Sequence, residues 1–293
     1  MILLWGAKMK MIANRTSFSV ILVLLFFQNF AQAKIETVLG NLPLEQNPNI
    51  AVQAPTTSAS EIILSRDQYV ISYNKSHRAP NWVAWKLEQK DIGNSGRTNS
   101  FAQDTELENY LVQTNAGHGV APSDYTNSCY DRGHQIPSAD RTDNKTDNAA
   151  TFLMSNMIPQ TPYLNRVVWE HLETYTRELI NQGKKVYVIA GPIYDADYGS
   201  IGPSTDIQVP SKDFKIIIVL DANQTTADIN STTQIIPVIM PNLQEDGSPV
   251  EVGQSCRPFK EVSGSDIHDW EQYKTTLSEV ERLSGVHFSF LPH

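Results

Sequence analysis

Short stretches rich in aromatic and β-branched residues recur along this chain, and they constrain its fold more than any other feature. The first two are bounded by Asn and Pro, which is typical of strands. The stretches are Gln68–Tyr73, Trp82–Leu87, Lys185–Ala190, Lys215–Leu220 and Gln234–Met240. Only two segments have helical periodicity. We therefore expect an α+β fold in which helices flank a central, mainly antiparallel sheet.

The longer helical segment covers about residues 161 to 181. Leu164 and Leu172 are among its apolar residues at helical spacing, and Pro162 suits a first helical turn. A second helix is expected at residues 271–283. The span from residue 93 to 130 is expected to be mostly loop.

The first 33 residues have the pattern of a secretory signal peptide. They combine a positively charged start, a short apolar run at residues 18–27 and small residues before a predicted cleavage site after Ala33. The apolar run is about half of the ~20 residues that span a bilayer, which makes a retained anchor the weaker interpretation. We expect a secreted or periplasmic protein without stable membrane association after cleavage.

The remaining 260 residues are long enough for one large domain with a sizeable core. Residues 34–60 are polar and rich in Pro, Ser and Thr, and are expected to form a loosely ordered N-terminal arm. Residues 61–293 then form a single domain, because we find no internal repeat, low-complexity tract or interdomain linker.

The charge balance excludes one class of protein. The formal charge is −9, and it becomes −12 without the signal peptide, which carries Lys8, Lys10 and Arg15 but no acidic residue. A protein that packages nucleic acid would be basic, because neutralising phosphates supplies most non-specific affinity. An enzyme that releases its products needs only a local basic patch.

The tetrapeptide Asp131-Arg132-Gly133-His134 is the main candidate for chemistry. His134 is the candidate general base, because an imidazole can accept a proton from an attacking water. A lone histidine in a loop is more often structural, and the neighbouring polar residues argue otherwise. Arg132 can bind a phosphate or form a salt bridge with Asp131 or Asp140. Asp131 would orient its neighbours, and Gly133 would let the backbone turn.

Four polar residues follow this motif at fixed spacing. Asn165 is the candidate metal ligand, because magnesium accepts one amide oxygen together with waters; alone, it would be assigned local backbone hydrogen bonds. Glu173 lies ~12 Å further along a continuous helix, so we assign it an outer-shell role. A pair with Arg177 is compatible with that role. Asn156 and Gln160 either bind metal waters or hold the hairpin and helix together.

Taken together, these residues resemble the sugar-non-specific DNA/RNA endonucleases of the ββα-metal (His-Me finger) class, whose signature is DRGH. The match continues through the SNxxPQ segment at residues 155–160 and the LN and LE pairs at 164–165 and 172–173, and it spans nearly the whole mature chain. A DRGH alone would be weak, whereas the joint spacing is specific.

The resemblance implies a ββα-metal active site that hydrolyses DNA and RNA with Mg²⁺, for which Mn²⁺ is a possible substitute. It implies His134 as base, Asn165 as magnesium ligand and Glu173 as a helper near the metal waters. Phosphate contacts would come from Arg132 and Arg97, with Arg177 as a further candidate, while Asp131, Asn156 and Gln160 form the polar shell.

One departure from the family lies just before the motif, where Ser128-Cys129-Tyr130 replaces the frequent Ser-Gly-Tyr. The chain has two cysteines, Cys129 and Cys256, which in an exported protein either form one disulfide or stay as free thiols.

Three rival functions remain open from the sequence. They are a phosphodiesterase acting on small nucleotides, a catalytically inactive nucleic-acid-binding relative, and a secreted toxin with an immunity protein. An inhibitor protein is therefore a candidate partner. The sequence does not fix the oligomeric state.

Overall fold

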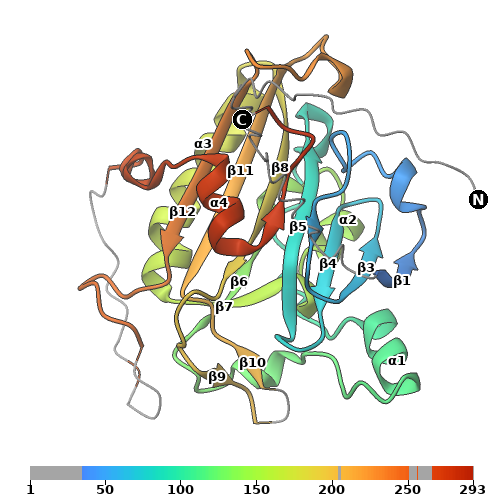
Figure 1. Ribbon diagram of the computed structural model, residues 1–293, viewed down its shortest axis with the longest axis vertical. Helices are drawn as coiled ribbons and strands as arrows, with labels where there is room; N and C mark the ends of the chain where they lie inside the picture. The colour runs from blue at the N-terminus through green and yellow to red at the C-terminus, as the bar shows by residue number, and fades with distance from the viewer. Residues whose placement is uncertain (1–34, 204–205, 251–255, 257–265, 293) are drawn as a thin grey trace, which may run out of the picture. The chain divides into compact units, whose positions relative to one another are not determined.

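The computed structural model describes residues 35–203, 206–250, 256 and 266–292. Its central feature is a seven-stranded sheet with the strand order β1-β3-β4-β5-β8-β11-β12 (Figure 1). The strands are β1 (Ile35–Gly40), β3 (Glu61–Ser65), β4 (Val70–Asn74), β5 (Ala79–Leu87), β8 (Lys184–Ile193), β11 (Lys212–Asp221) and β12 (Gln234–Pro241). Neighbouring strands are antiparallel, except for the parallel pair β1 and β3. The predicted α+β class and mainly antiparallel sheet are confirmed.

Both faces of the sheet are buried, because its strands carry apolar side chains at alternate positions on both sides. On β11, Ile217 belongs to the core cluster that includes helix α3 (Trp169–Asn181). Its neighbour Ile216 belongs to the opposite cluster, which includes helix α4 (Leu277–Ser284). The candidate site lies on the α3 side.

A hairpin and a helix carry most of the residues singled out in the sequence. Strand β6 (Asp131–His134) pairs antiparallel with β7 (Met157–Gln160). A π-helical turn, η6 (Leu164–Val168), then leads directly into α3. The connection between β6 and β7 contains the short helices η4 (Ser138–Asp140), α2 (Lys145–Ala150) and η5 (Met154–Asn156). This ββα unit packs against the central sheet (Figure 1).

Smaller elements complete the described fold. The helical ones are η1 (Leu44–Gln46), η2 (Gln89–Asp91), α1 (Thr105–Gln113), η3 (Pro122–Tyr125), η7 (Thr226–Asp228) and η8 (Asp269–Tyr273). The short strands are β2 (Thr56–Thr57), β9 (Ser200–Ile201), β10 (Ile207–Gln208) and β13 (Val286–His287). Within the described part of the chain, no helix has the length and apolarity to cross a membrane.

From residue 35 on, the expected N-terminal arm is paired with the rest of the fold, which differs from the loose order expected for residues 34–60. Its strand β1 extends the central sheet beside β3. Further along, the buried side chain of Asn47 donates to the Arg66 carbonyl oxygen at 2.9 Å and to Ser65 Oγ at 3.0 Å. Pairing of backbone groups with a distant strand orders this segment, and a polar composition does not reveal such pairing.

Two helix expectations also differ from the structure. The segment at 271–283 is divided into η8 and α4, because Lys274 forms a β-bridge with Val238 and the Thr276 side chain caps α4 by accepting from the Glu279 amide. In the expected loop at 93–130, α1 forms because Asp104 caps its start and two leucines on one face are buried.

The structure joins Cys129 to Cys256 in a disulfide, with a Cα–Cα distance of 5.1 Å. The bridge closes a sequence separation of 127 residues directly before the motif strand β6. The predicted signal peptide and its cleavage site lie outside the described residues.

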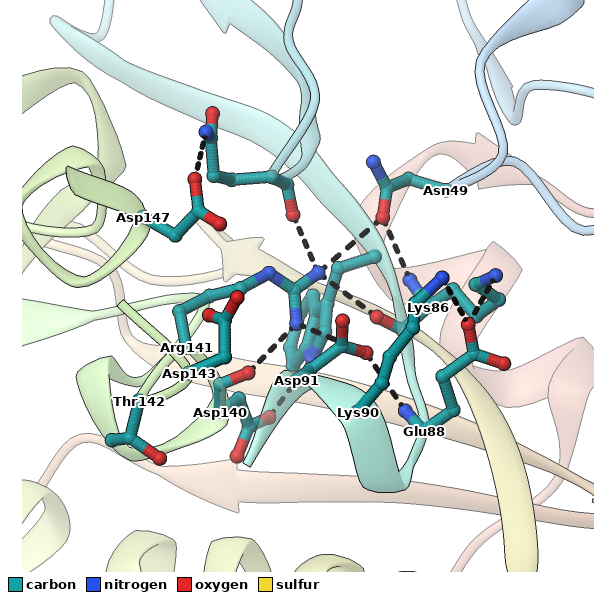
Figure 2. A network of polar contacts seen from close by, with 12 residues as sticks. Asn49, Lys86, Glu88, Lys90, Asp91, Asp140, Arg141, Thr142, Asp143 and Asp147 are labelled. Carbon is teal, nitrogen blue, oxygen red and sulfur yellow. Dashed lines mark hydrogen bonds and ion pairs between the residues drawn. The ribbon is translucent and has the colours of Figure 1, made fainter. Parts of the chain in front are cut away.

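A buried arginine, Arg141, lies in the connection between β6 and β7 and bonds to several elements (Figure 2). Its guanidinium donates to the carbonyl oxygens of Gln68 at 2.6 Å, Asp140 at 2.8 Å and Lys86 at 2.9 Å. The Asn49 side chain accepts a longer bond at 3.4 Å. This Arg141 network fixes the turn η4, whose Ser138 and Asp140 contact candidate site residues.

Candidate active site

The register of the β6–β7 hairpin determines which side chains share a face. Asp131 lies opposite Gln160, and His134 lies opposite Met157. Alternation along β6 puts Arg132 and His134 on one face and Asp131 and Gly133 on the other. A Cβ atom at Gly133 would overlap the Gln160 side chain, so only glycine leaves room for that amide beside the strand.

His134 lies in an aromatic pocket and is 8% exposed. Its ring contacts Phe152 edge-to-face at a centroid distance of 4.9 Å and Phe101 at 5.6 Å. The Arg132 backbone hydrogen-bonds to the ring, while Nε2 has no hydrogen-bond partner among the described residues. A buried nitrogen without a partner is uncommon in a folded protein and favours a role with a bound ligand.

The electrostatics of this pocket favour the unprotonated form of His134. Burial and the positive charges of Arg97 and Arg132 together lower its pKa to about 3, although the Arg132 backbone bond opposes the shift. A free imidazole has a pKa near neutrality, because it is neither buried nor beside two cations. A phosphate anion bound between those cations would raise the pKa again and make the ring a stronger base.

Two arginines lie beside the same aromatic rings. The Arg97 guanidinium lies 4.8 Å from the centre of the Phe152 ring, and that of Arg132 lies 4.0 Å from the centre of Phe101. Arg97 also donates to Asn99 Oδ1 and Ser138 Oγ, each at 2.8 Å. Arg132 makes neither of the salt bridges weighed from the sequence. The two guanidiniums form a basic patch suited to phosphate oxygens.

Asn165 is held by the other face of β6. Its Nδ2 donates to Asp131 Oδ2 at 2.9 Å, and Arg166 binds both oxygens of the same carboxylate at 2.6 and 2.7 Å. Asp131 thus holds the amide nitrogen of Asn165, and Asn165 Oδ1 accepts no hydrogen bond from the described residues.

Glu173 lies on α3 and is paired with a residue that the sequence analysis did not single out. Its Oε1 is 3.7 Å from Nζ of Lys215 on β11. Burial raises the Glu173 pKa to about 7, and Lys215 and Arg177 oppose this shift. Arg177 itself contacts Asp140 at 3.4 Å and Glu170 at 3.6 Å rather than forming the expected pair with Glu173.

The two remaining amides have different surroundings. Asn156 is fully engaged with backbone groups of Ile136 and Thr151, which is the structural alternative for this residue. Gln160 donates from Nε2 to Asp213 Oδ2 at 2.5 Å, and its Oε1 has no partner among the described residues. Gln160 thus links the hairpin to β11.

The sequence did not single out Asp213 and Lys215 as site neighbours, and it offered Asp140 only as a salt-bridge partner of Arg132. A signal for Asp213 and Lys215 exists, because these charged residues lie two positions apart, directly before the apolar run at residues 216–220. The structure places His134, Arg97 and Arg132 around Phe101 and Phe152. Burial lowers the pKa of Arg97, and the negative charge of Glu173 opposes this shift. No described hydrogen bond joins His134 directly to Asn165; strand β6 connects them.

Known proteins resemble this chain over most of its length. The model of the DNA/RNA non-specific endonuclease family matches residues 45–292. A nuclease of Nostoc sp. is 39% identical over 245 residues, covering 83% of this chain and 78% of the relative. A nuclease of Serratia marcescens is 33% identical over 196 residues, covering 64% and 68%. Human mitochondrial endonuclease G is 32% identical over 236 residues, covering 76% and 68%.

A solved structure agrees with these relatives. A chain in the crystal structure of the EndoG/EndoGI complex is 26% identical to this one and matches its fold with a TM-score of 0.60. The match covers 79% of this chain and 86% of that chain. Sequence and fold thus point to the same family. The chain belongs to the DNA/RNA non-specific endonuclease family and is a hydrolase acting as an endonuclease.

Proposed function

We propose that this protein hydrolyses phosphodiester bonds of DNA and RNA without sequence preference, with His134 as general base and a magnesium ion on Asn165. The observation that carries the proposal is the buried His134 ring, whose Nε2 has no partner among the described residues. The ring packs against the same two phenylalanines that Arg97 and Arg132 contact. Contacts from arginines to phosphate carry no base information, so cleavage is independent of sequence.

The residues around Asn165 fit a magnesium site. Asp131 takes the amide nitrogen of Asn165, which leaves the hard oxygen donor that magnesium prefers. Within the described residues, no group of three or more His, Cys, Asp or Glu side chains could hold a metal. One amide oxygen completed by waters and substrate phosphate is a sufficient donor set, and Mn²⁺ is a substitute with the same ligand preference.

In this mechanism His134 takes a proton from the water that attacks phosphorus. Arg97 and Arg132 bind the phosphate oxygens and stabilise the negative charge that develops on them. Phe101 and Phe152 pack edge-to-face against the imidazole and fix its orientation. Glu173 serves as a helper near the metal waters, and Arg177 is a more remote phosphate contact. A bound Mg²⁺ supplies Lewis-acid stabilisation of the leaving 3′ oxygen.

Export and partners form the second part of the proposal. The first 33 residues would direct the protein out of the cytoplasm and be removed after Ala33, leaving a secreted or periplasmic enzyme without stable membrane association. Some relatives carry mitochondrial names, so location differs among similar proteins. The neighbouring EndoG/EndoGI structure concerns inhibition, which supports an inhibitor protein as a candidate partner here.

The test of the proposed activity uses the purified protein with supercoiled plasmid, single-stranded RNA and bis-p-nitrophenyl phosphate. Each substrate is incubated with Mg²⁺, with Mn²⁺ and with a chelator. We expect both polymers to be cut at many positions with either metal, chelation to abolish cutting, and added Mg²⁺ to restore it. Turnover of the small diester alone would contradict the proposal and favour the small-nucleotide phosphodiesterase. No turnover of any substrate would favour the inactive binding relative.

A further inference from the structure

The α3-facing side of strand β11 changes from apolar to charged residues toward the start of the strand. At alternate positions on its α3-facing side, Ile217 and Val219 are apolar core residues, whereas Lys215 and Asp213 are charged. Both charged residues are almost completely buried, at 1% and 0% exposed. A sheet face that only needed to pack against a helix would continue with apolar residues, because burying a charge is costly.

The ammonium group of Lys215 has few but specific neighbours. Nζ is 3.7 Å from Glu173 Oε1 and 4.1 Å from the centre of the Trp169 ring, with the Trp85 ring at 5.9 Å. The indole faces attract the cation, and the carboxylate is the only ion-pair partner that the described residues give it. Lys215 thus reaches from the sheet to a candidate site residue on α3.

Glu173 depends on this contact more than on its other neighbours. The charged groups that influence it come from β11 (Lys215), from α3 (Arg177 and Glu170), from η4 (Asp140) and from the loop that carries Arg97. The Arg177 guanidinium is already engaged by Asp140 and Glu170. Among the described residues, Lys215 is the residue that forms an ion pair with Glu173.

We propose that Lys215 is a positioning residue for phosphodiester hydrolysis, which acts by holding Glu173 as an ionised, oriented carboxylate at the active site. The inference rests on the proposed function and adds a residue outside the ββα unit to its machinery. Lys215 contacts neither substrate nor metal in this role. Its effect is transmitted entirely through Glu173, and burial raises the pKa of that carboxyl while Lys215 lowers it.

The principal variant is Lys215→Met, which keeps the length of the side chain and removes its charge. We expect nuclease activity at pH 7 to fall by about 10- to 100-fold, as for the loss of a group that orients a metal site. The loss should shrink as the pH rises to 9, because deprotonation restores the Glu173 carboxylate. Lys212→Met is the matched control on the same strand, where the lysine pairs with Asp195 instead, and its activity should stay within about two-fold of wild type.

A double-mutant cycle tests whether Lys215 acts through Glu173. In a Glu173→Gln background, adding Lys215→Met should change activity by less than about three-fold, because the carboxylate that it serves is gone. Equal losses in both backgrounds, or a loss independent of pH, would overturn the proposal. The double variant lacks both buried charges and is expected to fold; Lys215→Gln, which also removes the charge, replaces Lys215→Met if that variant does not fold.

A readout independent of activity separates this inference from the proposed function. The ¹³C carboxyl resonance of Glu173, assigned by its absence in Glu173→Gln, is titrated in wild type and in Lys215→Met. The carboxyl should titrate at higher pH in the variant. If wild type cuts no nucleic acid, the proposed function fails while this titration still reports the contact. If the protein is active but the titration is unchanged, the Lys215 role alone is wrong.

Discussion

Arg141 and Lys215 are the two buried arginine or lysine residues in the described part of the chain, and their polar groups are satisfied very differently. Arg141 has hydrogen bonds of 2.6 to 2.9 Å to three carbonyl oxygens (Figure 2). Lys215 has one carboxylate at 3.7 Å and two aromatic faces. Because a buried polar group costs free energy unless it is paired, a fold that only needed stability would favour the first arrangement.

The same contrast extends to the neighbours of each cation. Around Arg141 the bonds link β5, η4 and the segments carrying Asn49 and Gln68, and they fix the turn that holds Arg97 and Arg177. Around the candidate site, His134 Nε2, Gln160 Oε1 and Asp213 Oδ1 have no partners among the described residues. The Arg141 network therefore supports the fold, while the candidate site contains buried polar atoms without partners among the described residues.

The largest expected effect is that of His134→Ala, which should reduce activity without unfolding the protein. We expect its nuclease rate to fall about 10²- to 10⁴-fold, the range for loss of a positioned base, while the variant remains folded. His118→Ala is the control, since that exposed side chain pairs with Glu108. Initial rates on plasmid are measured beside a thermal melt. Full magnesium-dependent activity in His134→Ala would refute its role as base.

Arg141→Met should show the opposite behaviour. Removing the guanidinium takes a donor from one buried and two partly buried carbonyl oxygens, so we expect the free energy of unfolding to fall by about 3 to 5 kcal/mol. The control is Arg282→Met, because that exposed arginine pairs with Glu279 on the surface and its removal should leave the free energy of unfolding nearly unchanged. Chemical denaturation measures both. Equal costs would show that the Arg141 network is not a structural anchor.

The smallest expected effect is a stabilisation by Asp213→Asn. Burial raises the Asp213 pKa to about 7, opposed by the Gln160 hydrogen bond and Lys215. Because the folded-state pKa exceeds the unfolded value near 4, the protonated carboxyl stabilises the fold below about pH 4, and that contribution is lost as the pH rises through 7. At pH 8 the variant should therefore be about 1 to 3 kcal/mol more stable than wild type.

This stabilisation should nearly vanish at pH 4, where the wild-type carboxyl is itself neutral in the fold. Denaturation curves at pH 4, 6 and 8 follow the trend. A variant that is less stable than wild type at pH 8 would show that the ionised Asp213 is well accommodated. The contrast between the hydrogen-bonded Arg141 network and the unpartnered polar atoms of the candidate site would then not include Asp213 on β11.

Much of the fold was predictable from local sequence. The alternating strands at β4, β5, β8, β11 and β12 and the helix α3 follow from periodicity that each segment carries by itself. The order of β1 was not predictable, because it depends on backbone pairing with β3. The division of the second predicted helix was also hidden, since the Lys274–Val238 bridge lies between segments that are distant in sequence.

The sequence by itself determined the family and the chemical inventory, because the spacing of His134, Asn165 and Glu173 is a property of the chain. Only the tertiary structure decided their surroundings. Burial between Phe101 and Phe152 keeps His134 unprotonated, Asp131 orients the Asn165 amide, and Lys215 arrives from a strand 42 positions beyond Glu173. Desolvation and charge pairing depend on distances in space, and no local pattern of residues encodes those distances.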